Sequence, residues 1–267
     1  MREKTELSKF LAAKKAAKQA ILVAYLPALY PDYQSSLRWI KLLFESGVDA
    51  LELGYPAQEA KMDGQIITEA NQELFAAGFT AEKYLNLAAD INSEAEINRL
   101  ILMGYWEELK KEFFSQYKER CLETGIKSLI LPDLKSKADK KQLQKEGFEI
   151  ISFMDKKEKI KSYQPGGEPF VYCPSYLGKT GQSGEFDRQH LKTLKESLNN
   201  SALASMPQLV GFGISSAEDA AQVMELGYDG IIVGSALLKK FKQGEEIALE
   251  FIKELKKGLA KEWSYVR

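Results

Sequence analysis

Two carboxylates in one short stretch of the chain have the types and spacing needed for proton transfer. Glu52 lies inside DALELG, an otherwise apolar run from Asp49, and Asp63 follows eleven residues later in a polar loop. Burying a carboxylate is costly unless it is paired or protonated, so burial should raise the pKa of Glu52 toward the range used in acid–base catalysis. Two carboxylates in different surroundings can divide the work, one staying ionised while the other exchanges protons. The pair predicts acid–base chemistry, and the alternative for Glu52 is a hydrogen-bonded structural role.

Strand alternation predicts where Glu52 points. In DALELG the side chains of Ala50, Glu52 and Gly54 share one face, and those of Leu51 and Leu53 share the other. If the two leucines pack beneath helices, Glu52 lies on the opposite face of the sheet and points away from those helices.

Two short glycine-containing sequences could bind an anion. GFGIS contains Gly211 and Gly213, and VGSA contains Gly234 and Ser235. Backbone N–H groups can approach an anion closely at glycines, and the start of a following helix favours negative charge. Tight turns are the alternative explanation for each glycine pair.

A third glycine-rich loop is YLGKTGQSGEF, which begins at Tyr176. It is polar and long enough to close over a substrate and exclude water. Lys179 and Thr180 are its candidate contacts to a phosphate or to a catalytic carboxylate. The alternative is a plain surface turn.

Composition limits the remaining chemistry. The chain has 267 residues, a net charge of −1 and a single histidine, His190, which we expect at the surface. The absence of a basic excess argues against nucleic-acid binding, and one histidine argues against a histidine triad or multi-histidine metal site, so we expect no metal. Cys121 and Cys173 are expected to be reduced, inert thiols. Without a membrane-length apolar run or a secretory signal, we expect a cytoplasmic protein that does not bind membranes.

These residues must be positioned by the elements around them, which follow a repeated β–α pattern. Short apolar runs alternate with longer amphipathic segments, as is typical of a parallel sheet. We expect an α/β fold of eight strands, the number that closes a (β/α)8 TIM barrel, in a single domain over residues 1–267. The eight strands are expected to begin at Ile21, Asp49, Arg99, Lys127, Phe148, Pro169, Gln208 and Gly230.

In a barrel of this kind, the active site lies at the carboxyl ends of the strands. Glu52 and Asp63 then follow the second strand, and Asp133 follows the fourth. Phosphate is frequently bound by the loops after strands seven and eight, which here are GFGIS and VGSA. Together the two glycine pairs predict a phosphate site.

Amphipathic segments between the runs are expected as helices. LSKFLAAKKAAK, from Leu7, should be an extra N-terminal helix that plugs the barrel, with a membrane-surface helix as the alternative. SAEDAAQVMELG has Ser215 and Ser216 as candidate N-caps and Gly227 as a candidate C-cap. The lysine-rich LKSKADKKQLQKEG is interpreted as a solvated helix face. Two further helical segments are expected, QSSLRWIKLLFES and YWEELKKEFFSQYKERCLETG.

Several motifs also occur in a fixed order along nearly the whole chain. LELGYP, with Asp63-Gly64 at a matching distance, is followed by LMGYW, LILPDL, YCPSYLGKTG, GFGIS and GIIVGSALL. This series resembles the α subunit family of tryptophan synthase. The resemblance implies retro-aldol cleavage of indole-3-glycerol phosphate to indole and glyceraldehyde 3-phosphate. It implies that Glu52 is the general acid/base and that Asp63 accepts a hydrogen bond from the indole N–H and stabilises the positive ring.

The resemblance also implies a substrate-binding set, cofactor use and a partner. The indole would lie in a flat apolar slot. The α reaction would need no cofactor in this chain, and pyridoxal phosphate would belong to a β-subunit partner in an α2β2 tetramer. The residues around the ring would be Tyr25, Tyr105, Tyr172 and Phe212. The residues at the phosphate would be Thr180, Gly181, Gly213, Gly234 and Ser235.

The loop after the second strand departs from the family pattern. The family usually has Pro-Phe-Ser-Asp-Pro-x-x-Asp-Gly-Pro, whereas residues 57–62 here read Ala-Gln-Glu-Ala-Lys-Met and Gln65 replaces the last proline. In two other loops, Leu29-Tyr30-Pro31 replaces Gly-Asp-Pro and Trp106-Glu107-Glu108 replaces Tyr-Asn-Pro. In the family, the loop after the second strand normally contacts the β subunit. We therefore expect retained catalysis, a more flexible loop and an altered fit to the partner.

Two alternatives to a coupled α subunit remain open. The divergent loop after the second strand is compatible with a stand-alone lyase that releases free indole, or with a related phosphosugar barrel that acts on another aglycone. A mainly non-catalytic activator of the β subunit is the second alternative, although both Glu52 and Asp63 are retained.

Overall fold

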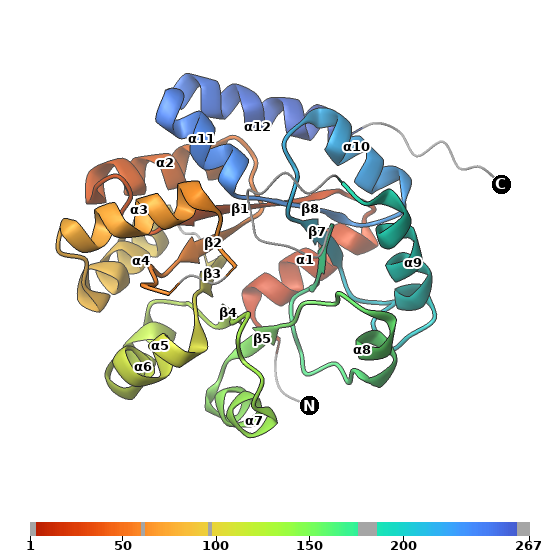
Figure 1. Ribbon diagram of the computed structural model, residues 1–267, viewed down its shortest axis with the longest axis horizontal. Coiled ribbons are helices and arrows are strands. Elements are labelled where there is room, and N and C mark those ends of the chain that lie inside the picture. Colours follow the sequence, from red (N-terminus) through yellow and green to blue (C-terminus); the bar gives the residue numbers. More distant parts are fainter. Residues whose placement is uncertain (1–3, 60–61, 96–97, 176–185, 261–267) are drawn as a thin grey trace.

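The computed structural model describes residues 4–59, 62–95, 98–175 and 186–260, and they form the predicted TIM barrel (Figure 1). The strands are β1 (Ile21–Pro27), β2 (Ala50–Gly54), β3 (Leu100–Met103), β4 (Ser128–Ile130), β5 (Glu149–Ile151), β6 (Val171–Pro174), β7 (Gln208–Gly211) and β8 (Gly230–Val233). All are parallel to their neighbours, in the order β5-β4-β3-β2-β1-β8-β7-β6. A parallel bridge between Phe153 and Tyr172 brings the chain after β5 beside β6, so the barrel is nearly closed.

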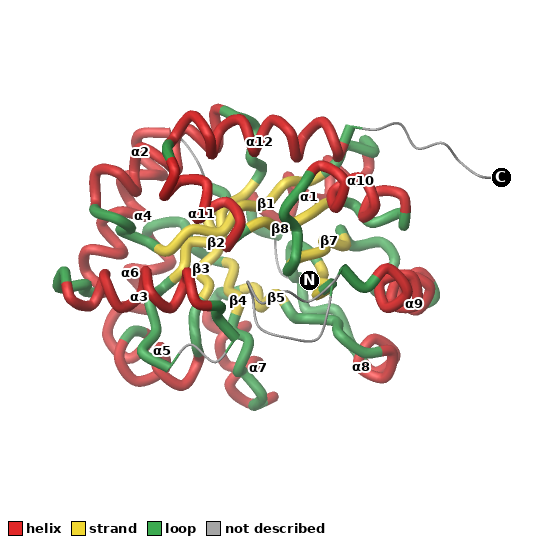
Figure 2. The backbone as a smooth tube through the Cα atoms, turned by 45° about the horizontal axis from the view of Figure 1, so that its top comes forward, coloured by secondary structure: helices red, strands yellow, loops and turns green. Residues whose placement is uncertain are grey.

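Helices other than α1 surround the strands on the outside of the barrel, as Figure 2 shows in red around yellow. The first helices are α1 (Glu6–Ala16), α2 (Tyr33–Glu45), α3 (Gln65–Ala76), α4 (Ala81–Ala95), α5 (Trp106–Glu112) and α6 (Phe114–Glu123). The later ones are α7 (Lys137–Glu146), α8 (Lys157–Ser162), α9 (Arg188–Asn199), α10 (Ala217–Glu225), α11 (Ser235–Gln243) and α12 (Glu245–Leu259). No helix within the described ranges is long and apolar enough to cross a membrane.

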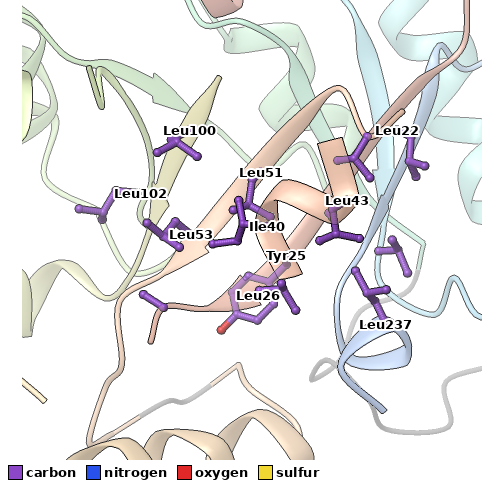
Figure 3. Packing of buried hydrophobic residues seen from close by; sticks show 14 of the residues in the cluster. Leu22, Tyr25, Leu26, Ile40, Leu43, Leu51, Leu53, Leu100, Leu102 and Leu237 are labelled. Atoms are coloured by element: carbon purple, nitrogen blue, oxygen red, sulfur yellow. The ribbon is translucent and has the colours of Figure 1, made fainter. Parts of the chain in front are cut away.

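The strands alternate between two hydrophobic clusters, as predicted for β2. Ala50 belongs to the cluster inside the barrel, whereas Leu51 and Leu53 belong to the cluster between strands and helices. Figure 3 shows these leucines near Ile40 and Leu43 of α2. Each fully buried side chain of this size stabilises the fold by about 1.5–3 kcal/mol. This packing fixes the face of β2 on which Glu52 lies.

Helix α1 closes the amino end of the barrel, which confirms the predicted plug. Leu7 and Leu11 are buried in the interior cluster together with Ile21 and Ala50. In Figure 1, α1 lies inside the ring formed by the other helices. Two ion pairs tie it to residues beside β2 and β8, Lys14 with Asp49 at 2.5 Å and Lys15 with Asp229 at 2.9 Å.

A buried carboxylate holds the start of α1 against the barrel. Glu149 accepts hydrogen bonds from the backbone N–H and hydroxyl of Thr5, at 3.2 and 2.7 Å. It also accepts from the hydroxyl groups of Ser8 at 3.0 Å and Ser128 at 3.1 Å. Thr5 is the N-cap of α1, so the same contacts fix the beginning of the helix.

The segment predicted as one helix after β3 is two helices. Helix α5 ends before Phe113 and α6 begins after it, because Phe113 has φ −104° and ψ −61°. The ring of Phe113 is fully buried and packs against Tyr55, Tyr84 and Phe114, with centroid separations of 5.2, 6.0 and 5.3 Å. Aromatic packing from other elements interrupts a helix that local periodicity predicted to be continuous.

Other helix predictions are confirmed with one refinement. Ser216 is the N-cap of α10, and its side chain accepts from the Asp219 N–H. Ser215 is not the cap; its hydroxyl donates to Asp219 at 3.0 Å. The cap at the other end is Leu226, and Gly227 follows it with a φ of +81°. The lysine-rich segment forms α7, in which Leu143 is the buried residue, as expected for a solvated helix.

Candidate active site

A pocket opens at the carboxyl ends of the strands, where the sequence predicts the site. Its empty volume is about 630 Å³, which includes space open to solvent. The predicted residues that line it are Tyr25, Glu52, Asp63, Tyr172, Phe212, Gly213, Gly234 and Ser235. Tyr105 lies behind Asp63 and bonds to it. Lys179, Thr180 and Gly181 lie outside the described residues.

Glu52 is the buried acid of the pocket. Its side chain lies beside Tyr25 of β1 and Ile101 of β3 in the sheet register, and the residue is 4% exposed. Its Oε1 atom is buried without a hydrogen-bond partner among the described residues. Loss of solvent disfavours the charged form and raises the pKa of Glu52 to about 8. The direction of this shift agrees with the sequence prediction, and burial favours the protonated form of Glu52 at neutral pH.

Asp63 is also buried, but it is hydrogen-bonded. Tyr105 donates its hydroxyl proton to Asp63 Oδ1 at 3.0 Å, and Asn71 donates its amide to Oδ2 at 3.4 Å. Burial raises the pKa of Asp63 above its ordinary value, while the bonds from Tyr105 and Asn71 act in the opposite direction. Because hydrogen bonds of this kind favour the carboxylate, Asp63 is the better placed of the two acids to stay ionised.

Tyr105 links Asp63 to the loop before it. Its hydroxyl accepts a hydrogen bond from the Met62 N–H at 3.0 Å while it donates to Asp63. Burial and the nearby Asp63 raise the pKa of the Tyr105 phenol above its usual range, so this group stays a proton donor. The family resemblance implies that Tyr105 lies beside the indole ring, and in the structure its hydroxyl bonds to Asp63 and to the Met62 N–H.

Aromatic rings form one wall of the pocket. Tyr172 and Phe212 have centroids 5.7 Å apart, and Phe153 lies 4.4 Å from Tyr172. Neighbouring glycines make room for the phenols: a Cβ at Gly211 would come within 2.2 Å of the Tyr172 oxygen, and one at Gly54 within 2.6 Å of the Tyr25 oxygen. The wall therefore needs glycine on the strand beside each tyrosine.

Backbone groups line another part of the pocket, next to the aromatic rings. Phe212 and Gly213 have φ values of +68° and +67°, and the Ser175 hydroxyl donates to the Phe212 carbonyl at 2.7 Å. Helix α11 begins at Ser235, and its N-cap Gly234 makes no side-chain capping bond. The first-turn N–H groups and the positive end of the helix dipole therefore face an end of the pocket that suits an anion.

Sequence reasoning missed Asn71, which binds Asp63, and several residues that line the pocket. Asn71 is an amide among the buried apolar positions of α3, and that interruption of an apolar face is the signal that could have identified it. Phe153 lies just after β5 and had no motif to mark it. The other lining residues that were missed are Met62, Ile67, Met103, Ile130, Pro132, Ile214 and Ile232.

Three other candidate groups lie elsewhere. Asp133 accepts hydrogen bonds from the N–H groups of Trp106 at 2.6 Å and Glu107 at 3.1 Å, so it holds the start of α5. His190 is half-buried rather than at the surface. Cys121 and Cys173 are free, in agreement with the prediction of reduced thiols, and both are buried. Among the described residues, no group of three or more His, Cys, Asp or Glu side chains could hold a metal ion.

Comparison with known proteins gives a consistent result. The family model described as Tryptophan synthase alpha chain matches residues 11–263. The chain is 29% identical to a tryptophan synthase alpha chain of Methanosarcina barkeri, over 96% of this chain and 98% of that protein. It is 31% identical to that of Caldicellulosiruptor bescii, over 94% and 96%. A structure of Mycobacterium tuberculosis tryptophan synthase has a chain with a TM-score of 0.83 and 27% identity, covering 96% of this chain and 99% of that one.

Proposed function

The chain belongs to the tryptophan synthase alpha chain family, a family of lyases in tryptophan biosynthesis, and on that basis we propose the reaction of its pocket. The substrate is indole-3-glycerol phosphate, and the products are indole and glyceraldehyde 3-phosphate. The observation that carries this proposal is the pairing of a protonated, buried Glu52 with a hydrogen-bonded Asp63 in one pocket.

Glu52 moves the protons. At neutral pH its carboxyl holds a proton that can be given to the ring carbon bearing the side chain, which leaves a positive charge on the indole nitrogen. The resulting carboxylate then takes the proton from the hydroxyl group on the adjacent side-chain carbon. That carbon becomes the aldehyde, the carbon–carbon bond breaks, and its electron pair returns to the ring to give indole. The proton on Glu52 is restored in the same step.

Asp63 stabilises the positive ring. An ionised carboxylate that accepts the indole N–H lowers the energy of the charged intermediate, because the interaction strengthens as charge develops. The bonds from Tyr105 and Asn71 fix the direction of the carboxylate and favour its ionised form. Tyr105 acts on the indole through Asp63 in this scheme.

Two parts of the pocket suit the two parts of the substrate. The rings of Tyr172 and Phe212, with Tyr25, form an apolar slot for indole. The phosphate is bound by backbone N–H groups of Gly213, which follows β7, and of Gly234 and Ser235 at the start of α11. Thr180 and Gly181 belong to the proposed phosphate set by their motif.

The proposal extends to the partner. Indole passes to a β subunit in an α2β2 tetramer, and pyridoxal phosphate belongs to that β subunit, while the α reaction uses only side chains of this chain. Family membership supports a β-subunit partner. A cytoplasmic location is part of the same proposal.

Indole release from the purified protein tests the reaction. Wild type mixed with indole-3-glycerol phosphate should release indole, and Glu52→Gln should lower kcat by about 10²–10⁴-fold because it removes the acid–base group. Glu69→Gln makes the same change at an exposed position of α3 and should leave kcat unchanged. Absence of turnover in wild type, alone and with a β subunit, would refute the proposal. A Glu52→Gln variant that keeps full turnover would refute the role of Glu52.

A further inference from the structure

The loop that carries Asp63 is held by a carboxylate from another element. Glu108 of α5 accepts the Gln58 N–H at 3.1 Å on Oε2 and the Glu59 N–H at 3.0 Å on Oε1. Gln58 and Glu59 lie after β2, outside any helix or strand. Both oxygens of one carboxylate thus bind two consecutive amides, and hydrogen bonds to a charged acceptor are about twice as strong as neutral ones.

The same helix start also holds the other side of this loop. Tyr105, the N-cap of α5, accepts the Met62 N–H and donates to Asp63. Glu108 lies three residues further on, in the first turn of the helix. The start of α5 therefore binds the loop at residues 58–59 and again at residues 62–63.

Helix α5 is itself fixed to the barrel. Asp133, which follows β4, binds the N–H groups of Trp106 and Glu107, and the Trp106 indole donates to Asp139 of α7 at 2.9 Å. Trp106 is buried. Because the backbone of α5 is anchored in this way, the Glu108 side chain can hold the loop in a fixed position relative to the barrel.

Charge pairing does not explain why Glu108 binds here. The groove beside it is lined by the further carboxylates Glu59, Glu107, Glu112 and Asp133, with two lysines, Lys111 and Lys135. A carboxylate in these surroundings meets like charge, which opposes its placement. The two backbone N–H groups supply the attraction that holds it against the loop.

We propose that Glu108 is a positioning residue for the α reaction: by fixing residues 58–59 it keeps Asp63 in place against the indole N–H. This inference rests on the proposed function. The sequence Trp106-Glu107-Glu108, which departs from the family pattern, would then hold the loop after β2, which also departs from it.

Three variants separate positioning from a general structural effect. Glu108→Ala removes both acceptors, Glu108→Gln keeps one carbonyl oxygen, and Glu107→Ala removes an exposed neighbouring carboxylate of the same charge. Steady-state kinetics with indole-3-glycerol phosphate give kcat and KM. Amide hydrogen exchange by NMR at Gln58 and Glu59 reports the contact itself, and a carboxyl ¹³C titration reports Asp63.

We expect Glu108→Ala to lower kcat about tenfold while KM stays within about twofold, because a misplaced group loses transition-state contacts and the phosphate end is untouched. Amide exchange at Gln58 and Glu59 should become about tenfold faster, since local opening is easier without the acceptor. Glu108→Gln should lie between wild type and Glu108→Ala in both measurements. Glu107→Ala should match wild type in both.

Each other outcome has a defined meaning. Faster exchange in Glu108→Ala with unchanged kcat would overturn the positioning role, and unchanged exchange would overturn the contact. If Glu108→Ala does not fold, the same readings on Glu108→Gln decide. If wild type releases no indole, the proposed function fails, and the exchange and the Asp63 titration still test whether Glu108 positions Asp63; an unaltered Asp63 titration would then refute it.

Discussion

Two carboxylates share one pocket and differ in what surrounds them. Glu52 has lost water without gaining a partner for Oε1, whereas Asp63 has lost water and gained Tyr105 and Asn71 as donors. Desolvation favours the neutral acid, and donated hydrogen bonds favour the anion. The different surroundings therefore suit Glu52 to proton exchange and Asp63 to charge stabilisation.

The pH dependence of kcat/KM should show both groups. Glu52 must begin protonated, and its pKa is raised to about 8, so activity should fall above about pH 8, by about tenfold per unit at the limit. Asp63 must be ionised, so activity should also fall at acid pH as it gains a proton. Initial rates from pH 5 to 10, corrected for enzyme stability, measure the two limbs. A profile that stays flat above pH 9 would show that Glu52 is not the acid.

Removing the Tyr105 hydroxyl should move only the acid limb. Tyr105→Phe deletes a hydrogen bond that favours the Asp63 carboxylate, so the pKa of Asp63 should rise and the acid limb of kcat/KM should move to higher pH. The limb near pH 8 should stay in place. Tyr33→Phe is the control, because Tyr33 donates to Asp90 at 2.5 Å outside the pocket. An acid limb that does not move in Tyr105→Phe would show that this hydroxyl does not lower the pKa of Asp63.

Helix α1 depends on a polar contact as well as on its leucines. Glu149 accepts hydrogen bonds from the Thr5 N–H and from the hydroxyl groups of Thr5, Ser8 and Ser128 at the buried amino end of the barrel. If the carboxylate is removed, three buried or half-buried hydroxyl groups lose their acceptor. Orphaned polar groups of this kind are costly.

Truncation of this carboxylate should therefore destabilise the protein. Glu149→Ala should lower the free energy of unfolding by about 3 kcal/mol, measured by urea denaturation at neutral pH. Glu6→Ala removes an exposed carboxylate from α1 itself, 3.7 Å from Lys9, and should cost less than about 0.5 kcal/mol. Equal effects for the two variants would mean that α1 is held by its leucines alone.

At the scale of the whole molecule, the alternation of short apolar runs with amphipathic segments predicted the barrel, because this pattern depends on residues that are close together in the sequence. The two-residue alternation in β2 predicts that Glu52 lies on the face opposite Leu51 and Leu53. Residue type predicts Ser215 or Ser216 as the N-cap of α10, and Ser216 is the cap. The ordered motifs brought Asp63, Gly213 and Gly234 into the same pocket.

Contacts between distant segments could not be predicted in this way. Phe113 divides a helix because Tyr55 and Tyr84 come from other elements, and local periodicity carries no sign of them. Glu108 binds amides that lie 49 and 50 residues earlier, and the role of Asp133 at the start of α5 depends on where that helix begins. Tertiary packing decides all three.

The burial of Glu52 also makes the stability of the whole molecule depend on pH. The unfolded chain releases this proton near pH 4.5, and the folded protein keeps it until about pH 8. Between these values the folded state binds more protons than the unfolded state, so the contribution of Glu52 to stability is complete below pH 4.5 and declines as pH rises to 8. The decline is of the order of 4–5 kcal/mol for a shift of this size.

Glu52→Gln should abolish this slope, because the amide keeps the shape of the neutral acid and does not titrate. Its free energy of unfolding relative to wild type should therefore rise steadily from pH 4.5 to 8, as measured by urea denaturation at several pH values. The difference between the two proteins isolates Glu52, since Asp63 and all other groups titrate in both. Glu69→Gln, at an exposed position, should give no such trend. A constant difference between Glu52→Gln and wild type across this range would mean that Glu52 is ionised in the folded protein. Glu52 could then not be the proton donor of the proposed reaction.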